Sequence, residues 1–391
     1  MNLSLIGSWM QSVALPWLVL SITADAFKVS LVAAARFLPA LLFTPFSGVL
    51  LDKFNRKKIL LLAQIGMAVT ASIFAVMSFC ELYSFGKILF CAFASGIFTS
   101  MDAPSRQSMV KDLIDSPRDL ANAIALNSMS FNVARIAGPA LAGIVMALWG
   151  VGFCFLFNAL SFLGIIVSLF FIKIPPSVTT LSSRSGGVFA SIGAGISYVS
   201  HKKILSELMI IVLIVATLVP NYNVTISALV KLSLDADERS FGYLMSALGV
   251  GAFCGALFVA IFDKLGIRKI RSCAIAMGAS LALTGAANSF AWAAAGLAAT
   301  GFLFVITNSS INSTVQMHVS NEFRGRVLSL YALFLIGSTP FGALISGFFT
   351  ELLGARVALA ICGAISILLL LALFYGFKIR RRMHFIFRDK V

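Results

Sequence analysis

The sequence predicts an all-α integral membrane protein in which twelve transmembrane helices form two pseudo-symmetric bundles of six. The first reason is composition, because 59% of the 391 residues are hydrophobic and 12% are charged, whereas soluble domains are about 45–50% apolar and 25% charged. The second reason is that apolar runs of spanning length follow one another along the chain. The third is a basic turn, GVLLDKFNRKK at 48–58, which recurs imperfectly as GALFVAIFDKLGIRK at 255–269.

Twelve runs reach the length of about 20 residues that a helix needs to cross a bilayer. They lie at about 3–22, 30–51, 59–79, 85–103, 121–148, 151–172, 204–230, 239–262, 271–290, 292–316, 326–350 and 354–378. Their continuous apolarity predicts helices rather than barrel strands, which alternate apolar and polar residues. Only Met1 and Asn2 precede the first run, so we expect a truncated N-terminus or a late start codon.

Positive charge predicts the orientation of the bundle. If the turn between the second and third helices is cytoplasmic, 23 of the 30 Lys and Arg residues lie on that side or in the C-terminal tail, and five lie on the other. Cytoplasmic loops carry an excess of Lys and Arg, so both termini are expected in the cytoplasm. The net charge of +15 is spread over the gaps between helices, which disfavours nucleic-acid binding.

A hydrophilic gap at 173–203 divides the chain. It contains PPSVTTLSSRSGG, a composition typical of a flexible linker. We therefore expect an N-terminal bundle at 1–172, a cytoplasmic linker, a C-terminal bundle at 204–378 and a basic tail at 379–391. The stretch 104–120 is expected to form an interfacial helix. A duplicated bundle with a central linker is typical of secondary transporters, whose halves rock around a site near the midplane.

The sequence shows no sign of catalysis. The six cysteines are scattered singly in apolar segments and the three histidines are far apart, so no metal site or disulfide framework is expected. The chain lacks a GxxxxGK[ST] motif, and no nucleophile–base pair is evident. We expect a protein that is not an enzyme and uses no cofactor. The expected partners are a small-molecule substrate, protons and the lipid bilayer, and the expected state is a monomer.

Three stretches carry a resemblance to a known family. The turn at 48–58 resembles the loop signature of the major facilitator superfamily, with matching residues Gly48, Asp52, Lys53, Arg56 and Lys57. Asn55 replaces the usual glycine, which we expect the turn to tolerate because Asn reaches left-handed conformations. RQSMVKDLIDSPRDLANAIALNSMSFNVARIAGPALAG (106–143) and EFRGRVLSLYALFLIGSTPFGALISG (322–347) resemble the bacterial exporter branch that contains the enterobactin exporter and macrolide efflux pumps. The resemblance implies the major facilitator fold, alternating access and an inner-membrane location.

The basic turn is also a candidate gate. The resemblance implies that it latches the two halves in one access state, with Asp52 facing the start of the eleventh helix near Arg324 and Arg326. Asp263 and Arg268 would form a weaker second copy. The alternative is a topology anchor, a role that the lysines have in either case.

Polar stripes on apolar helices indicate a candidate substrate cavity. Polar residues in a bilayer are costly unless they face the bundle interior or water. The fifth and tenth helices each carry such a stripe on one face. The candidate cavity residues are Gln11, Arg36, Asn127, Asn132, Arg135, Asn221, Tyr222, Asn308, Asn312 and Gln316. The alternative for each amide is a hydrogen bond between helices, worth roughly 0.6 kcal/mol.

The charged residues in or next to the predicted helices each have more than one possible role. Arg135 lies near the midplane, where an arginine costs at least about 2.5–3.5 kcal/mol. It either binds an anionic group of the substrate or pairs with a carboxylate such as Asp102. Arg36 either reaches the headgroups or faces the cavity. The proton-carrier candidates are Asp102, near Arg106, and Asp25, because no carboxylate lies clearly at the midplane.

Glycine and proline occur at corresponding places in the fifth and eleventh helices. Gly138, Pro139 and Gly143, and Pro340 in the second half, permit close packing and kinks; they serve packing or a hinge. The sequence thus predicts a secondary active transporter, and the resemblance implies that it exports a drug- or siderophore-like molecule, which we expect to be exchanged for protons. An uptake symporter of the same fold and a non-transporting membrane sensor or scaffold are the alternatives.

Overall fold

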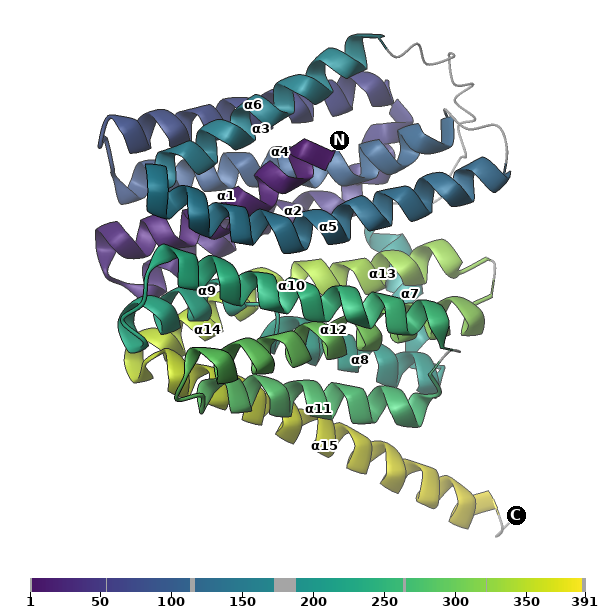
Figure 1. The fold of residues 1–391 in the computed structure, drawn as a ribbon. Helices are drawn as coiled ribbons and strands as arrows, with labels where there is room; N and C mark the ends of the chain where they lie inside the picture. Colours follow the sequence, from purple (N-terminus) through teal and green to yellow (C-terminus); the bar gives the residue numbers. More distant parts are fainter. Residues whose placement is uncertain are drawn as a thin grey trace.

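The computed structural model describes residues 2–53, 55–112, 117–171, 188–262, 265–320 and 322–388, and these residues form helices and short turns without strands. The first bundle contains α1 (Asn2–Thr23), α2 (Ala26–Lys53), α3 (Arg56–Phe79), α4 (Phe85–Asp112), α5 (Pro117–Trp149) and α6 (Val151–Phe171). The second contains α8 (Lys203–Leu218), α9 (Tyr222–Ala228), the π-helix η1 (Leu229–Ser233), α10 (Glu238–Ile261), α11 (Ile267–Gly285), α12 (Phe290–His318), α13 (Arg324–Gly337), α14 (Thr339–Leu353) and α15 (Ala355–Arg388). Figure 1 shows the two bundles one above the other, with α5 of the first beside α10 of the second.

The predicted fold class is confirmed, with a difference in the number of clearly apolar spans. In the described residues, 11 segments are long and apolar enough to cross a membrane, against twelve expected. The segment that does not qualify is α11, which begins with Arg268, Lys269 and Arg271 and has only 19 residues. It nevertheless packs along α12 and α15, as the other spans do.

Two predicted spans are interrupted near their middle. The seventh span divides into α8 and α9, and Pro220 lies in the turn between them. The eleventh divides into α13 and α14, with Pro340 in the first turn of α14, where its missing N–H has no helical partner to lose. Pro139, by contrast, lies inside the continuous helix α5.

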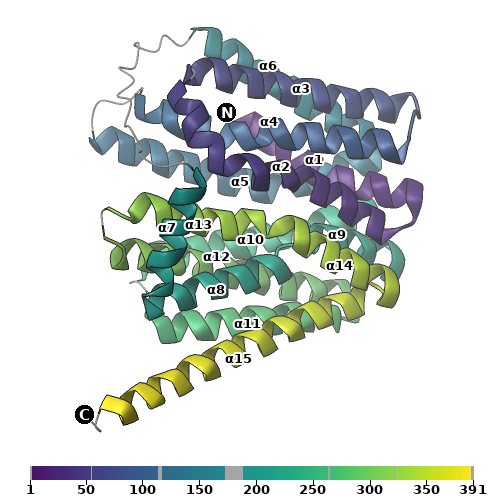
Figure 2. The same cartoon turned by 180° about the vertical axis from the view of Figure 1, so that it is seen from behind.

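The connections differ from the predicted ones in two places. The flexible linker expected at 173–203 contains a helix, α7 (Val188–Ser200), which packs on α13 and α8 and runs across the other helices in Figure 2. Its mostly apolar sequence, VFASIGAGISYVS, explains why it packs. The interfacial helix expected at 104–120 is not a separate element, because α4 continues to Asp112 and α5 begins at Pro117.

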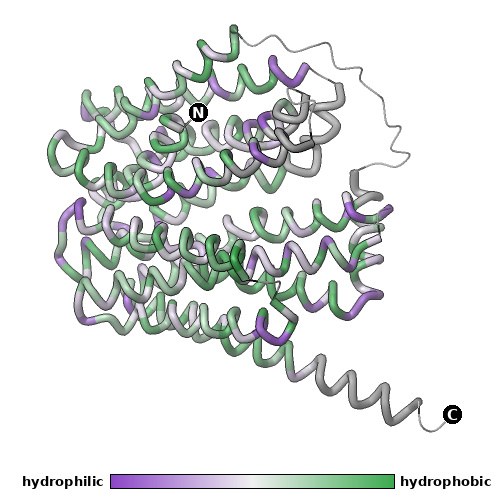
Figure 3. Tube along the Cα trace, turned by 45° about the vertical axis from the view of Figure 1, so that its right-hand side comes forward, coloured by the Kyte–Doolittle hydropathy of each residue, from purple (hydrophilic) through white to green (hydrophobic). Residues whose placement is uncertain are grey.

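The bundle has two ends, which we name by their connections. The linker side is the end where α7 lies and where α12 meets α13. The far side is the opposite end, where α1 turns into α2 and α5 turns into α6. Figure 3 shows long apolar stretches along the helices and hydrophilic residues concentrated towards the ends, as expected for a chain that crosses a bilayer.

Candidate functional site

Trp17 of α1 joins the two bundles on the far side. Its indole Nε1 donates a hydrogen bond of 3.1 Å to Glu238 Oε1, and its ring stacks on that of Phe241 with centroids 5.6 Å apart. Lys231 Nζ lies 5.2 Å from the centroid of the same indole ring and donates to Ser21 Oγ at 2.7 Å. Trp17 is only 3% exposed, so these contacts form a packed connection between α1, η1 and α10.

A second far-side connection lies between α2 and α14. Glu351 Oε2 accepts a hydrogen bond of 2.8 Å from the backbone N–H of Ala26 at the start of α2. A carboxylate is favourable there because the first N–H groups of a helix have no partners within the helix. A Cβ added to Gly347 would lie 2.2 Å from Ser30 Cβ, so α2 and α14 touch at the level of their backbones.

Small residues also bring α5 and α10 into close contact, as they do α2 and α14. A Cβ on Gly242 would lie 2.5 Å from Pro139 O and 2.8 Å from Gly143 Cα, and one on Gly143 would lie 2.9 Å from Glu238 O. Within the first bundle, a Cβ on Gly138 would lie 2.4 Å from Trp9 Cβ. The glycines predicted to serve packing or a hinge therefore do lie at close helix contacts.

A polar cavity of about 690 Å³ opens between α12 and α13. Its lining residues are Asn308, Ser309, Asn312, Ser313, Gln316, Met317, Arg324, Tyr331 and Leu335. The structure thus brings together the predicted cavity residues of the tenth span and adds Tyr331 to them. Exposure of the lining rises from the half-buried Asn308 to the exposed Gln316, so the cavity opens towards the linker side.

The amides of this cavity are only partly satisfied by the protein. Asn308 Nδ2 donates to Phe304 O at 3.0 Å, but Asn308 Oδ1 is buried without a hydrogen-bond donor in the described part of the chain. Gln316 Nε2 donates to Asn312 Oδ1 at 2.5 Å, and Tyr331 donates to Asn308 O at 3.2 Å. A buried carbonyl oxygen without a donor is costly, so Asn308 is suited to bind a polar ligand or water.

The stripe on α5 shows the same gradient of exposure. Asn127, nearer the linker side, is exposed, and Asn132 is half-buried. Arg135 lies about two turns beyond Asn127 and is 9% exposed. The Arg135 guanidinium carbon lies 6.0 Å from the centroid of the Trp9 ring. The ring of Phe131 meets Trp9 edge-on at 5.7 Å between centroids. Arg135 therefore lies beside an aromatic pair from α1 and α5.

The pair with Asp102, one of the two alternatives for Arg135, is not formed in this structure. Asp102 forms an ion pair with Arg106 and accepts a hydrogen bond of 2.6 Å from Gln64 Nε2, which ties α4 to α3. Asp25 accepts from the backbone N–H of Lys28 at 2.9 Å and pairs with its ammonium at 3.3 Å. Asp25 therefore caps the first turn of α2 and is held at the surface.

Several predicted cavity residues pack between helices instead. Gln11 is 3% exposed and accepts a hydrogen bond of 2.6 Å from Asn158 Nδ2 of α6, so in this structure it packs between α1 and α6 and does not line the cavity predicted for it. Asn221 donates to Thr217 O at 2.8 Å at the break between α8 and α9. Tyr222 packs, half-buried, against the apolar core. Arg36 is half-buried on α2, beside Gly96 of α4.

The predicted gate is described only in part. Gly48, Asp52 and Lys53 lie in the last turns of α2, but their side chains and the whole of Asp263 fall outside the described residues. Arg56 and Lys57 begin α3, and Arg268 is exposed at the start of α11. Asn55 has φ −62° and accepts hydrogen bonds from Lys57 N and Lys58 N, so it caps α3 and the left-handed conformation expected for it is wrong.

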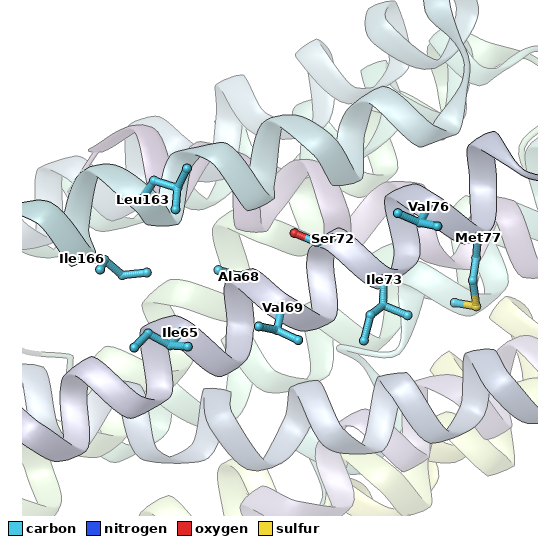
Figure 4. Close-up of a pocket in the computed structure, with 9 residues that line it drawn as sticks. All are labelled: Ile65, Ala68, Val69, Ser72, Ile73, Val76, Met77, Leu163 and Ile166. Carbon is cyan, nitrogen blue, oxygen red and sulfur yellow. The ribbon is translucent and has the colours of Figure 1, made fainter.

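A separate groove of about 610 Å³ lies on the outer surface of α3 and α6. Figure 4 shows its lining, which is apolar except for Ser72. Ile65, Val69 and Leu163 in this lining are 41%, 51% and 50% exposed. A surface of this kind suits contact with lipid tails and lacks the polar groups that would select a soluble substrate.

Two joined helical bundles, with a polar cavity between membrane helices, define this chain as a multi-pass membrane transport protein. Residues 1–385 match the family described as transmembrane secretion effector, so the chain belongs to this family of major facilitator superfamily transporters. The predicted family is therefore confirmed, and the protein is a transporter and not an enzyme. In the described residues, no group of three His, Cys, Asp or Glu could hold a metal ion.

The chain is similar to bacterial transporters over most of its length. It is 24% identical to the uncharacterized MFS-type transporter YfiS of Bacillus subtilis, covering 97% of this chain and 91% of that protein. It is 23% identical to macrolide efflux protein A of Streptococcus pyogenes, covering 90% of this chain and 88% of that protein. Its fold matches that of the nucleoside transporter NupG with a TM-score of 0.72, at 16% identity, covering 97% of this chain and 100% of that chain.

Proposed function

We propose that the protein exports a small amphipathic organic molecule across the bacterial inner membrane by alternating access. The observation that carries this proposal is the polar cavity of α12 and α13, whose exposure rises towards the linker side. On the far side, Trp17 and Glu351 join the two bundles. A chamber that is open at one end and closed at the other is suited to load substrate from the open end.

We infer the direction of transport from the relatives and from placing the linker side in the cytoplasm. The excess of Lys and Arg on that side supports this orientation. A cavity that is open to the cytoplasm can load substrate there, as export requires. Macrolide efflux protein A is named for efflux, and the matching family is described as a secretion effector, which supports the same direction. We infer that Asn308, Asn312 and Gln316 bind polar groups of the substrate.

We infer that export is driven by proton entry, with Asp102 as the proton carrier. Asp102 is largely buried, with 14% of its side chain exposed, and its partners Arg106 and Gln64 belong to the same bundle. Protonation of Asp102 would weaken both contacts, because they depend on its negative charge. Asp52 and the basic residues after it remain our candidates for the gate that closes the linker side in the opposite state.

Inverted membrane vesicles test this proposal. Respiration acidifies their interior, and a fluorescent cationic amphiphile such as a rhodamine ester is added outside. An exporter coupled to protons should accumulate the dye and release part of the pH gradient. Asp102→Asn should abolish accumulation while leaving downhill movement of the dye intact. Asp25→Asn is the matched control and should leave accumulation unchanged.

The sign of the flux separates this proposal from its alternative. Accumulation only when the interior is alkaline would support an uptake symporter and contradict export. Identical dye movement in vesicles with and without the protein, for the dye and for metabolites extracted from the host, would contradict transport of small organic molecules.

A further inference from the structure

Arg135 is a buried cation without an anionic partner among the residues that the structure describes. It is 9% exposed, and its Nε has no hydrogen-bond acceptor in the part of the chain that the structure describes. The buried carboxylates that could have neutralised it are engaged elsewhere. Asp102 pairs with Arg106, and Glu207 accepts two hydrogen bonds, of 2.5 and 2.7 Å, from Arg271.

An unpaired arginine is costly at this depth. Charged side chains inside membrane proteins almost always pair with an opposite charge or with backbone carbonyls. A planar guanidinium with a free Nε edge presents parallel N–H groups that match the two oxygens of a carboxylate or phosphate. The position therefore suits an anion that arrives from outside the chain.

The surroundings of Arg135 indicate what accompanies that anion. Trp9 lies with its ring centroid 6.0 Å from the Arg135 guanidinium carbon. Phe131 is 44% exposed one turn closer to the linker side on the same face of α5, and it meets Trp9 edge-on. An aromatic group can pack on these rings because they offer both a flat face and an accessible edge.

We propose that Arg135, Trp9 and Phe131 form a subsite that binds an anionic group attached to an aromatic body, and that the substrates of this transporter include aromatic carboxylates. This inference rests on the proposed export function. The same anionic chemistry is present in the headgroups of acidic phospholipids, so the test distinguishes a soluble anion from a lipid.

The test compares two dyes that differ in one group. One is a rhodamine with a free benzoic acid, and the other is the methyl ester of the same rhodamine. Binding of each dye is measured by fluorescence polarisation, with the full-length protein in nanodiscs of phosphatidylcholine. The protein should bind the acid more tightly than the ester. Arg135→Gln should weaken binding of the acid about 10- to 100-fold, because it removes a charge-assisted contact, and should change ester binding less than twofold.

Two further variants establish that the charge acts locally. Arg135→Lys keeps the charge but loses the planar fork, so it should weaken acid binding less than Arg135→Gln does. Arg356 is the matched control, because its Nε is also buried without a partner in the described residues but it lies in the first turn of α15 on the far side. Arg356→Gln should leave binding of both dyes unchanged.

Several results would overturn the subsite. Equal affinity for acid and ester, no binding of either dye, or an acid preference that survives in Arg135→Gln would each do so. Loss of the acid preference in nanodiscs of phosphatidylglycerol would show that a lipid headgroup occupies Arg135 and would also overturn the assignment to substrate. If Arg135→Gln still accumulates the ester in inverted vesicles, the export function stands whatever the binding result is.

Discussion

Replacement of Trp17 by phenylalanine should shift the balance towards molecules that are open on the far side. The substitution keeps an aromatic ring beside Phe241 but removes the indole N–H that donates to Glu238. That hydrogen bond joins α1 to α10, so it is present only while the two bundles meet on this side. The substitution therefore acts on the balance between access states and leaves the fold of each bundle largely unchanged.

The magnitude follows from the type of contact. A hydrogen bond to a charged group contributes about 1.5–3 kcal/mol, and phenylalanine also gives a weaker cation–ring contact with Lys231 than tryptophan does. A loss of about 2 kcal/mol would raise the ratio of far-side-open to far-side-closed molecules about 30-fold. The contacts of Glu351 and Gly242 remain, so the closed state should still predominate.

Cysteine labelling measures this shift. Ser30 is 0% exposed in the contact between α2 and α14, so Ser30→Cys in a background without the six native cysteines reports opening. A membrane-impermeant maleimide should label it slowly, and Trp17→Phe should raise the rate about 30-fold while the open state is rare. The control is Trp149→Phe, because Trp149 is 58% exposed and contacts Phe153 of the same bundle. Equal labelling rates in the Trp17 and Trp149 variants would refute the reasoning.

Three further predictions concern helix contacts. Gly242→Ala should hinder closure of the far side, because the added Cβ would lie 2.5 Å from a backbone oxygen of α5. The Ser30→Cys reporter should then be labelled faster, and an unchanged labelling rate would count against this prediction. Glu207→Gln should lower the free energy of unfolding by about 1.5 kcal/mol, seen as a lower Tm in detergent. The loss is moderate because the Arg271 guanidinium, left without its carboxylate, is partly exposed and can be solvated. An unchanged Tm would mean that the pair is dispensable. Hydrogen bonds with Lys202 and with Ser320, which lies just after α12, lower the pKa of Tyr198 in α7 to about 8 from 10.0. The part of this shift that comes from Ser320 depends on docking, whereas Lys202 lies four residues along the same segment. Docking therefore favours the phenolate, so α7 should dock more firmly as the pH rises from 8 towards 10, and Tyr198→Phe should remove this dependence of hydrogen exchange in α7.

The helices of the two bundles could be predicted from the sequence, because a helix that crosses a bilayer needs an apolar run of about 20 residues. The sixth span was expected at 151–172 and forms Val151–Phe171, and the third was expected at 59–79 and forms Arg56–Phe79. Apolarity predicted such ends well, since the residues that leave the lipid are polar. It predicted interruptions less well. The apolar run at 204–230 continues through the break at Pro220, because hydropathy does not register a missing backbone donor.

The far-side contacts could not be predicted from local patterns. Trp17 lies in an apolar run, and nothing near it in the sequence indicates a partner 221 residues away. Glu238 follows Asp237 at the start of α10, where acidic residues are expected simply as helix caps. The connection exists because two distant segments meet in space, and a periodicity within one helix carries no information about which helix lies opposite.

The contrast between Gln11 and Asn308 shows the physical limit of predictions from polar stripes. Both residues lie on polar faces of apolar helices, and no local pattern distinguishes them. In the structure, Gln11 Oε1 is bonded to Asn158 and is removed from any ligand. Asn308 Oδ1 has no donor in the described residues and lines the polar cavity. A stripe identifies the face on which an amide lies, but its role depends on whether another helix supplies the complementary group. For the same reason Arg135, whose predicted partner Asp102 is paired with Arg106 instead, is the residue whose unpaired charge a ligand could best neutralise.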